Sequence, residues 1–274
     1  STRDWSSDVC SSDLTWTAKL SASDLQALQG NVTLDVLTTD KVGNVSSDTI
    51  KSFTIATLNP SAPSVVTPIA VDNIINASEA NAGVTLTGSA PAGTALGFKV
   101  DGKAISFNAA DLVQVGSTWT LSLNAQQVSA IGENSHSLIV SATDTYGNVS
   151  FSPAIPFSID TLAPAVSGPS SVGGSDNIIN SAEANASVTL TGTAEAGSRV
   201  EVVVLNSDQS VAQTLTVTNS LVGTNWSIPL SKTQIDNLGQ GPHSIKVVAT
   251  DLAGNVASSA PVSFTVDTVA PITP

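Results

Sequence analysis

The sequence repeats itself over about one hundred residues, and this repetition restricts the chain to a tandem array. The segment DNIINASEANAGVTLTG at 72–88 returns as DNIINSAEANASVTLTG at 176–192, a step of 104 residues. The signature T-D-x-x-G-N-V occurs at 39–45, 143–149 and 250–256. Such a period is too long for one unit of a solenoid and equals one small domain. We therefore expect separate domains joined end to end.

The phase of these motifs predicts where each domain begins and ends. Trp16, Trp119 and Trp226 keep the same phase as the repeated segments, and the closing VDTVAP echoes the earlier IDTLAP. The predicted division is a truncated half-repeat at 15–60, a complete middle repeat at 61–163, a complete C-terminal repeat at 164–270, and the start of a further linker at 271–274.

The first residues do not belong to this pattern. Residues 3–14, RDWSSDVCSSDL, match no repeat and coincide with the in-frame translation of a common sequencing-adapter oligonucleotide. We expect residues 1–14 to be an adapter-derived artefact without ordered structure, and we leave them out of fold reasoning. The alternative is a genuine disordered linker. The chain also has no Met, and we expect it to be an internal fragment of a longer protein.

Each repeat alternates apolar and polar residues over short runs, as half-buried strands do. In Trp119-Thr-Leu121-Ser-Leu123 and Trp226-Ser-Ile228-Pro-Leu230 the tryptophans fall on the inward phase. Gly, Pro, Asn and Asp separate the runs. Seven or so strands in roughly 100 residues are typical of an Ig-like sandwich. The sequence therefore predicts an all-β fold of tandem Ig-like β-sandwich domains in an elongated array.

Two local motifs recur in every repeat. A helix N-cap with a reciprocal third residue predicts one short helical turn per repeat. The T-D-x-x-G-N-V signature predicts a hairpin, with Asp opening the turn and Gly in the left-handed conformation. The predicted capping pairs are Ser21 with Asp24, Asn124 with Gln127, and Ser231 with Gln234.

Charge and cysteine content narrow the classes of partner. The chain has 22 acidic and 9 basic residues and a net charge of −13. Such a chain is a poor partner for nucleic acid or anionic membrane and favours cations. Its one cysteine, Cys10, lies in the segment that we set aside. No apolar run approaches the roughly 20 residues needed to span a bilayer, so we expect no membrane insertion.

We expect no enzyme activity. His136 and His243 occupy equivalent positions, but neither has a second histidine or a repeating nucleophile nearby in the sequence. A catalytic set would need a nucleophile, a base and an orienting group within reach of one another. A structural role for both histidines is the simpler prediction.

The strand pattern, the T-D-x-x-G-N loop and the D-T-x-A-P linker together resemble the bacterial Ig-like repeats of giant Gram-negative surface adhesins. The biofilm-associated and type I-secreted adhesins are members of this group. The resemblance covers essentially all of 15–274. It implies an extracellular stalk at the bacterial cell surface that serves adhesion and biofilm formation. The implied partners are neighbouring repeats of the same chain, with host or matrix glycans and proteins bound by other parts of the full protein.

In that family, many stalks carry structural Ca²⁺ at the junctions between repeats. Calcium takes roughly six to eight oxygen ligands, and the linker and loops at one end of a sandwich supply carboxylates. At the junction after the middle repeat the expected ligands are Asp72, Glu79, Asp160 and Asp251. The preceding junction offers Asp144, and the last one offers Asp176, Glu183 and Asp267.

Other interpretations of these residues stay open. The hairpin aspartates are equally explained as turn caps, and we favour an ordinary structural role for Glu79 and Glu183. Ala56 stands where the other linkers have Asp160 and Asp267, which weakens a metal site at the first junction. The alternative function is glycan or receptor binding by each repeat, for which Tyr146 at a hairpin tip is the one plausible aromatic platform.

Overall fold

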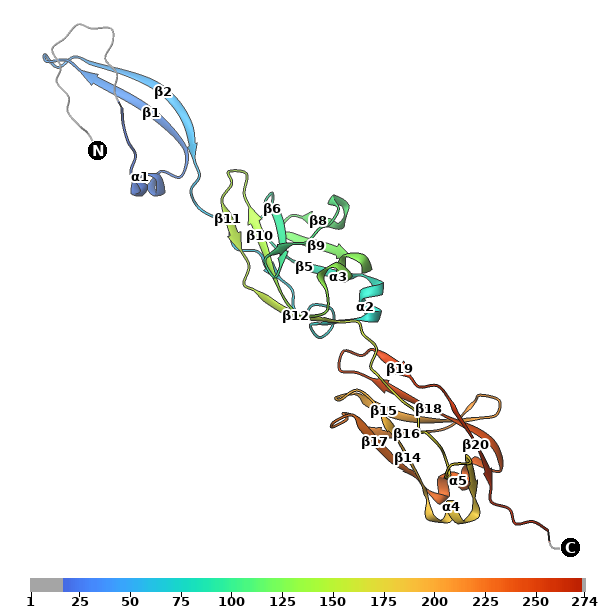
Figure 1. Cartoon of the computed structure of the whole chain (residues 1–274). Coiled ribbons are helices and arrows are strands. Elements are labelled where there is room, and N and C mark those ends of the chain that lie inside the picture. Colours follow the sequence, from blue (N-terminus) through green and yellow to red (C-terminus); the bar gives the residue numbers. More distant parts are fainter. Residues whose placement is uncertain (1–16, 273–274) are drawn as a thin grey trace.

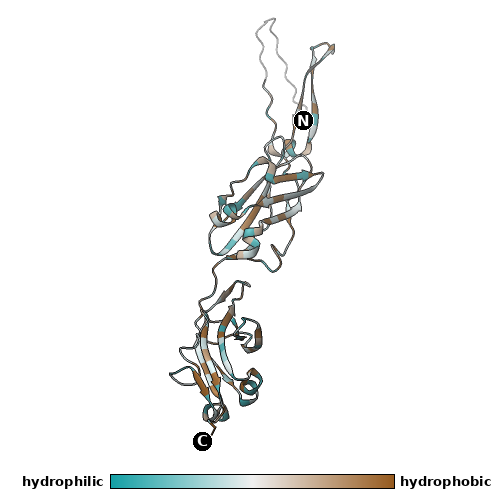
Figure 2. Cartoon of the chain, turned by 90° about the vertical axis from the view of Figure 1, so that its right-hand side faces the viewer, coloured by the Kyte–Doolittle hydropathy of each residue, from teal (hydrophilic) through white to brown (hydrophobic). Residues whose placement is uncertain are grey.

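The chain forms three β-rich bodies that follow one another along an extended line (Figure 1). A computed structural model describes residues 17–272, apart from the side chains of residues 49 and 50. Figure 2 presents the same extended arrangement after a quarter turn. The predicted all-β, elongated fold is confirmed. The expectations for residues 1–14, for Trp16 and for residues 273–274 concern positions outside the described residues.

The half-repeat is a helical turn followed by one long hairpin. Its strands pair antiparallel from Gly30–Ile55 to Thr39–Val45, with a bulge between Leu34 and Asp35. Its elements are α1 (Ala22–Ala27), β1 (Gly30–Thr39) and β2 (Val45–Ile55).

The middle repeat is a sandwich of two sheets, with strand orders β4-β12-β10-β6-β7 and β3-β5-β9-β8, and β11 pairs with β10. Its elements are β3 (Ser64–Val65), β4 (Ile74–Asn76), α2 (Ala77–Ala82), β5 (Val84–Ser89), β6 (Ala95–Val100), β7 (Lys103–Ala104), the 3-10 helix η1 (Ala109–Asp111), β8 (Leu112–Val115), β9 (Thr118–Leu123), α3 (Ala125–Ile131), β10 (Asn134–Thr143), β11 (Val149–Phe151) and β12 (Ile155–Asp160).

The C-terminal repeat keeps this plan, with a sheet ordered β13-β20-β18-β15-β16, a second sheet of β14 and β17, and β19 paired with β18. The two repeats differ in one strand near the middle of each. In the middle repeat this strand, β8, pairs with β9, whereas in the C-terminal repeat the strand β16 pairs with β15. Its elements are β13 (Ile178–Asn180), α4 (Ser181–Ala186), β14 (Val188–Thr193), β15 (Arg199–Asn206), β16 (Val211–Thr218), β17 (Asn225–Leu230), α5 (Lys232–Leu238), β18 (Gly241–Thr250), β19 (Val256–Ser258) and β20 (Val262–Asp267).

One tryptophan anchors each complete core. Trp119 and Trp226 are buried, as the alternation predicts, and apolar bands alternate with polar ones along the strands in Figure 2. A Cβ added at Gly88 would lie 2.4 Å from the Trp119 ring, and one at Gly192 would lie 2.5 Å from the Trp226 ring. The glycine that ends V-T-L-T-G therefore makes room for the indole.

The local motifs form as predicted, with one addition. The capping boxes at Ser21, Asn124 and Ser231 are present. Residues 61–163 and 164–270, however, each contain a second helix, α2 and α4, that the single predicted turn did not include. Asn76 and Asn180 cap these helices, with Glu79 and Glu183 as the reciprocal residues. The N-x-x-E spacing is the signal that sequence reasoning overlooked.

Among the described residues, no second sheet covers the apolar face of the half-repeat. Phe53 is 39% exposed, whereas its counterparts Phe157 and Phe264 are 6% and 3% exposed. In the complete repeats, the second sheet and the α2 or α4 segment cover the equivalent face. No helix among the described residues is both long and apolar enough to cross a membrane.

Candidate inter-repeat junction

The hairpin loop of the T-D-x-x-G-N motif is held by its own aspartate. In the C-terminal repeat, Asp251 Oδ1 accepts a hydrogen bond from the Asn255 backbone N at 2.8 Å, and Asp251 Oδ2 accepts one from Asn255 Nδ2 at 2.9 Å. Gly254 takes the left-handed φ of 92° that the turn requires. Asp144 with Asn148, and Asp40 with Asn44, make the same pair of bonds.

The asparagine of this loop crosses to the preceding repeat. Asn255 Nδ2 donates to the carbonyl oxygen of Asp160 at 2.8 Å, and Asn255 Oδ1 accepts from the backbone N of Ala77 at 2.8 Å. Asn255 is only 5% exposed, and its neighbour Ala253 is 6% exposed. The side chain therefore sits in a closed contact between two folded bodies.

The sheet topology of the middle repeat brings the two partners of Asn255 together. Strand β12 ends at Asp160 and runs parallel to β4, so that Asp160 is paired with Asn76. Ala77 follows Asn76 as the first residue of α2. A carbonyl at a strand end and an amide at a helix start both lack a partner within their own element, and Asn255 satisfies both.

The junction between the half-repeat and the middle repeat has one of these two bonds. Asn148 Nδ2 donates to the carbonyl oxygen of Ala56 at 3.1 Å, and Ser150 Oγ donates to the carbonyl oxygen of Pro60. Tyr146, at the tip of the loop, is 64% exposed. The described half-repeat has no segment equivalent to α2, so the second partner of the asparagine is missing from this junction.

A second device fixes the linker itself. Glu133, just after α3, accepts hydrogen bonds from the backbone N of Thr161, at 2.9 Å, and from its hydroxyl. Glutamine holds the threonine in the other two bodies: Gln29 Oε1 accepts from the backbone N of Thr57 while Gln29 Nε2 donates to its hydroxyl oxygen, and Gln240 and Thr268 make the same two bonds. The threonine that follows Ala56, Asp160 or Asp267 is thus clamped each time. Sequence reasoning missed this clamp, although the acid or amide recurs at one phase.

Seven of the eight predicted calcium ligands, all but Asp267, accept a local hydrogen bond from a backbone N. Among residues 17–272, no group of three or more His, Cys, Asp or Glu side chains is arranged to hold a metal ion. In each case the carboxylate is the acceptor and a nearby backbone N–H is the donor. The pairs, with the acceptor first, are Asp72 and Ile74, Glu79 and Asn76, Asp144 and both Tyr146 and Asn148, Asp160 and Leu162, Asp176 and Ile178, Glu183 and Asn180, and Asp251 and Asn255.

Asp267 ends β20 beside Asn180. The oxygen donors suit the chemistry of calcium, whereas their arrangement does not form a coordination shell. The predicted metal sites stay predictions.

Hydrogen bonds lower the pKa values of two hairpin aspartates. The Asn148 side chain, together with backbone N–H groups, lowers the pKa of Asp144 below the ordinary range of aspartate. The Asn44 side chain lowers the pKa of Asp40 in the same way. Donors aimed at a carboxylate favour its charged form. Both loops are therefore held most firmly when their aspartate is ionised.

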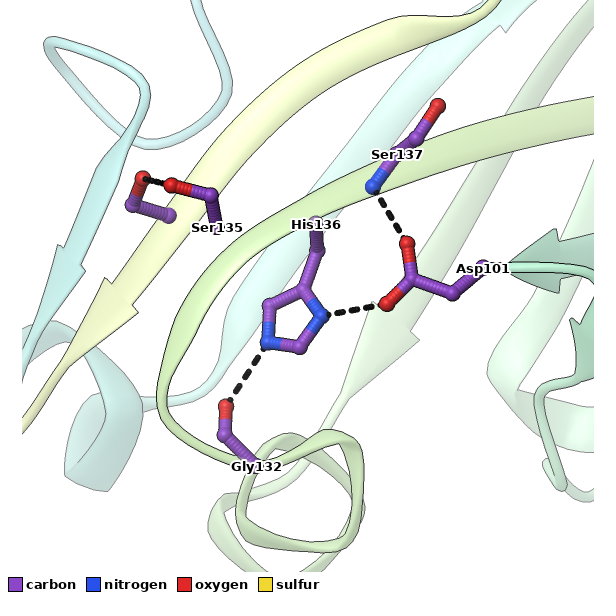
Figure 3. A network of polar contacts seen from close by, with 6 residues as sticks. Asp101, Gly132, Ser135, His136 and Ser137 are labelled. Carbon is purple, nitrogen blue, oxygen red and sulfur yellow. Dashed lines mark hydrogen bonds and ion pairs between the residues drawn. The ribbon is translucent and has the colours of Figure 1, made fainter.

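The His136 ring makes two hydrogen bonds within the middle repeat (Figure 3). Its Nδ1 lies 2.8 Å from Asp101 Oδ2, and its Nε2 lies 3.0 Å from the carbonyl oxygen of Gly132. The His136 bond lowers the pKa of Asp101, with help from the backbone N of Ser137. His243, its counterpart, is 7% exposed and packs against Phe264 with the two rings tilted by 34°. The predicted structural role is consistent with both environments.

A shallow groove of about 260 Å³ lies at the foot of the middle repeat, beside this junction. Ala80, Val128 and Ile159 contribute apolar lining, while Glu133 and Thr161 line another part. Glu133 and Thr161 are bonded to each other, and Asn81 and Ser129 add further polar lining.

The fold and the junction define a protein of tandem Ig-like sandwiches. Residues 165–268 match the family model of the bacterial Ig-like domain. The C-terminal repeat is therefore similar to bacterial Ig-like domains, in agreement with the resemblance noted in the sequence. No curated protein matches the chain.

Several solved structures are similar in outline. A 1.5-MDa bacterial ice-binding adhesin is 23% identical, with 93% of this chain and 80% of that chain covered and a TM-score of 0.43. A Ca²⁺-stabilised adhesin that helps an Antarctic bacterium bind ice is 24% identical, with 93% and 61% covered and a TM-score of 0.43. Titin fragment I67–I69 is 14% identical, with 77% and 66% covered and a TM-score of 0.46. This chain thus spans less than two thirds of the second adhesin structure.

Proposed function

We propose that the chain is a structural stalk segment of a secreted bacterial surface adhesin, located outside the cell, that serves cell adhesion and biofilm formation. The observation that carries this proposal is the junction after the middle repeat. There the linker is clamped by Glu133 and the next repeat is bonded to it through Asn255. A joint bonded on both sides suits a spacer that must hold its length.

These repeats act as spacers and not as enzymes. The histidines serve packing and local hydrogen bonds, and the largest core residues are close-packed apolar side chains. The partners of each repeat are the repeats before and after it. Host or matrix glycans and proteins are bound by other parts of the full protein.

The finer part of the proposal concerns calcium. Asp160 ends β12, Asp72 precedes β4, Glu79 lies in α2 and Asp251 lies in the hairpin whose Asn255 bonds Ala77. Like-charged carboxylates repel one another without a cation and converge around one. Calcium at this end would add stiffness outside the cell, and mass action would stabilise the joint.

Small-angle scattering tests both parts. We expect the chain to be extended in chelator and to become stiffer in millimolar CaCl₂, with the Asp160→Ala variant losing the calcium response. A compact, freely bending particle in both buffers would contradict the stalk proposal. An extended particle whose shape ignores calcium would contradict the calcium part alone.

Glycan or receptor binding by the repeats is the second candidate. The observation in its favour is the exposed ring of Tyr146 at a hairpin tip, 64% accessible. A glycan array probed with the parent chain and a Tyr146→Ala variant tests it. Binding that depends on the ring would support this function.

A further inference from the structure

We infer that Asn255 is a latch between repeats, and that it holds the junction without any metal ion. This inference rests on the proposed stalk function, because a latch matters only where consecutive repeats must keep a fixed direction. It assigns a role to the most repeated motif of the sequence, T-D-x-x-G-N.

Three hydrogen bonds hold the side-chain amide of Asn255. One Nδ2 hydrogen goes to the Asp160 carbonyl and the other to Asp251 Oδ2, while Oδ1 accepts from Ala77 N. Both donor hydrogens of the amide are therefore used, together with one of the two lone pairs of its oxygen. Asn255 is 5% exposed. If the two repeats separated, the Asn255 amide, the Asp160 carbonyl and the Ala77 N–H would all have to be solvated by water instead.

Asp251 is the positioning residue of the latch. Its Oδ1 accepts from Asn255 N and its Oδ2 from Asn255 Nδ2, which fixes the side chain relative to its own loop. The amide therefore points outward in one orientation before it meets the preceding repeat. Preorganisation of this kind lowers the entropy lost on contact.

The other copies of the loop support the assignment. Asn148 makes the carbonyl half of the contact, with Ala56, at 3.1 Å. Asn44 has the same internal bonds to Asp40, at 2.8 and 2.7 Å, but no described residue precedes it as a folded repeat. Asn44 is therefore a natural control for the loop without the joint.

The opposite side of the joint offers a matched pair of variants. Ala77 is the first residue of α2, and Ser181 is the first residue of α4. Proline is well tolerated at this helix position and removes only the backbone N–H. Ala77→Pro therefore deletes the donor to Asn255 Oδ1, while Ser181→Pro makes the same change where no described repeat follows.

Residual dipolar couplings measured on the full chain in chelator test the latch. In the parent, we expect the middle and C-terminal repeats to share one alignment tensor. Asn255→Ala and Ala77→Pro should each lose that shared alignment, while Asn44→Ala and Ser181→Pro keep it. Chemical shifts of the Trp119 and Trp226 indoles verify that each repeat remains folded.

The outcomes separate the two proposals. A parent whose repeats align together only after calcium is added overturns the latch and leaves the stalk intact. A parent that is rigid in chelator, together with equally rigid Asn255→Ala and Ala77→Pro variants, also overturns the latch. A parent whose repeats tumble independently with and without calcium overturns the stalk function itself.

Discussion

Asn255 and Asp160 are joined by a hydrogen bond of 2.8 Å that links two separately folded repeats. The acceptor is a backbone carbonyl at the last residue of β12, so the bond acts at the rigid end of a strand and not on a free linker. A single bond of this kind contributes about 1 kcal/mol. It acts together with the bond from Ala77 N to Asn255 Oδ1, and the two bonds restrict rotation of one repeat against the other.

The linker clamp should tolerate an amide but not a methyl group at position 133. Glu133→Gln reproduces the pairing seen between Gln240 and Thr268, so we expect Thr161 amide exchange close to that of the parent. Glu133→Ala should speed exchange of that amide by about tenfold or more, because the amide loses its hydrogen bond to a charged group. Amide exchange followed by NMR measures both. Equal exchange in the two variants would rule the clamp out.

Glycine at the end of V-T-L-T-G should be needed for the core. In Gly192→Ala, the new Cβ would lie 2.5 Å from the Trp226 ring and 2.9 Å from the Ser167 carbonyl oxygen. We expect a loss of about 1–3 kcal/mol from overpacking, measured by urea unfolding monitored through tryptophan fluorescence. Gly168→Ala is the control, since its nearest neighbour is the Ser259 hydroxyl at 3.1 Å. A wild-type midpoint for Gly192→Ala would contradict the packing argument.

Acid should weaken the middle repeat through Asp101. The bond from His136 lowers the pKa of Asp101 in the folded state, so folding gains stability above the ordinary aspartate pKa of about 3.9. This gain is lost as the pH falls through the folded pKa. Asp101→Asn should therefore give a shallower fall of melting temperature between about pH 4 and pH 2. Asparagine suits the positive φ of 50° at this position.

Melting curves at matched ionic strength provide the measurement. Parallel pH profiles for the parent and Asp101→Asn would show that other carboxylates carry the acid sensitivity.

Equivalent phenylalanines should differ in energetic importance. Phe157 is buried in a complete sandwich, and Phe157→Ala should cost about 3–5 kcal/mol. Phe53 is 39% exposed, so Phe53→Ala should cost less than half as much. Hydrogen exchange of β10 and β1 reports the two losses separately in the full chain. Similar losses at both sites would mean that the half-repeat has a closed core.

Much of the fold follows from local patterns. Alternation predicts strands with Trp119 and Trp226 inside, and the capping spacing at Asn124 predicts α3, because these signals depend on neighbours a few residues away. The same logic could have found α2 from Asn76 and Glu79. The different pairing of β8 and β16 could not be predicted, since both runs alternate and the choice of partner sheet depends on packing.

The sequence by itself determined that this protein is a string of β-sandwiches, and it drew attention to T-D-x-x-G-N as the recurring loop. Only the tertiary structure decided what that loop does. Asn44 and Asn255 stand in the same motif and make the same local bonds, yet only Asn255 bridges both Asp160 and Ala77, which lie 95 and 178 residues away. The physical reason is that a bond between repeats depends on how one folded body meets the next, and no local pattern encodes that orientation.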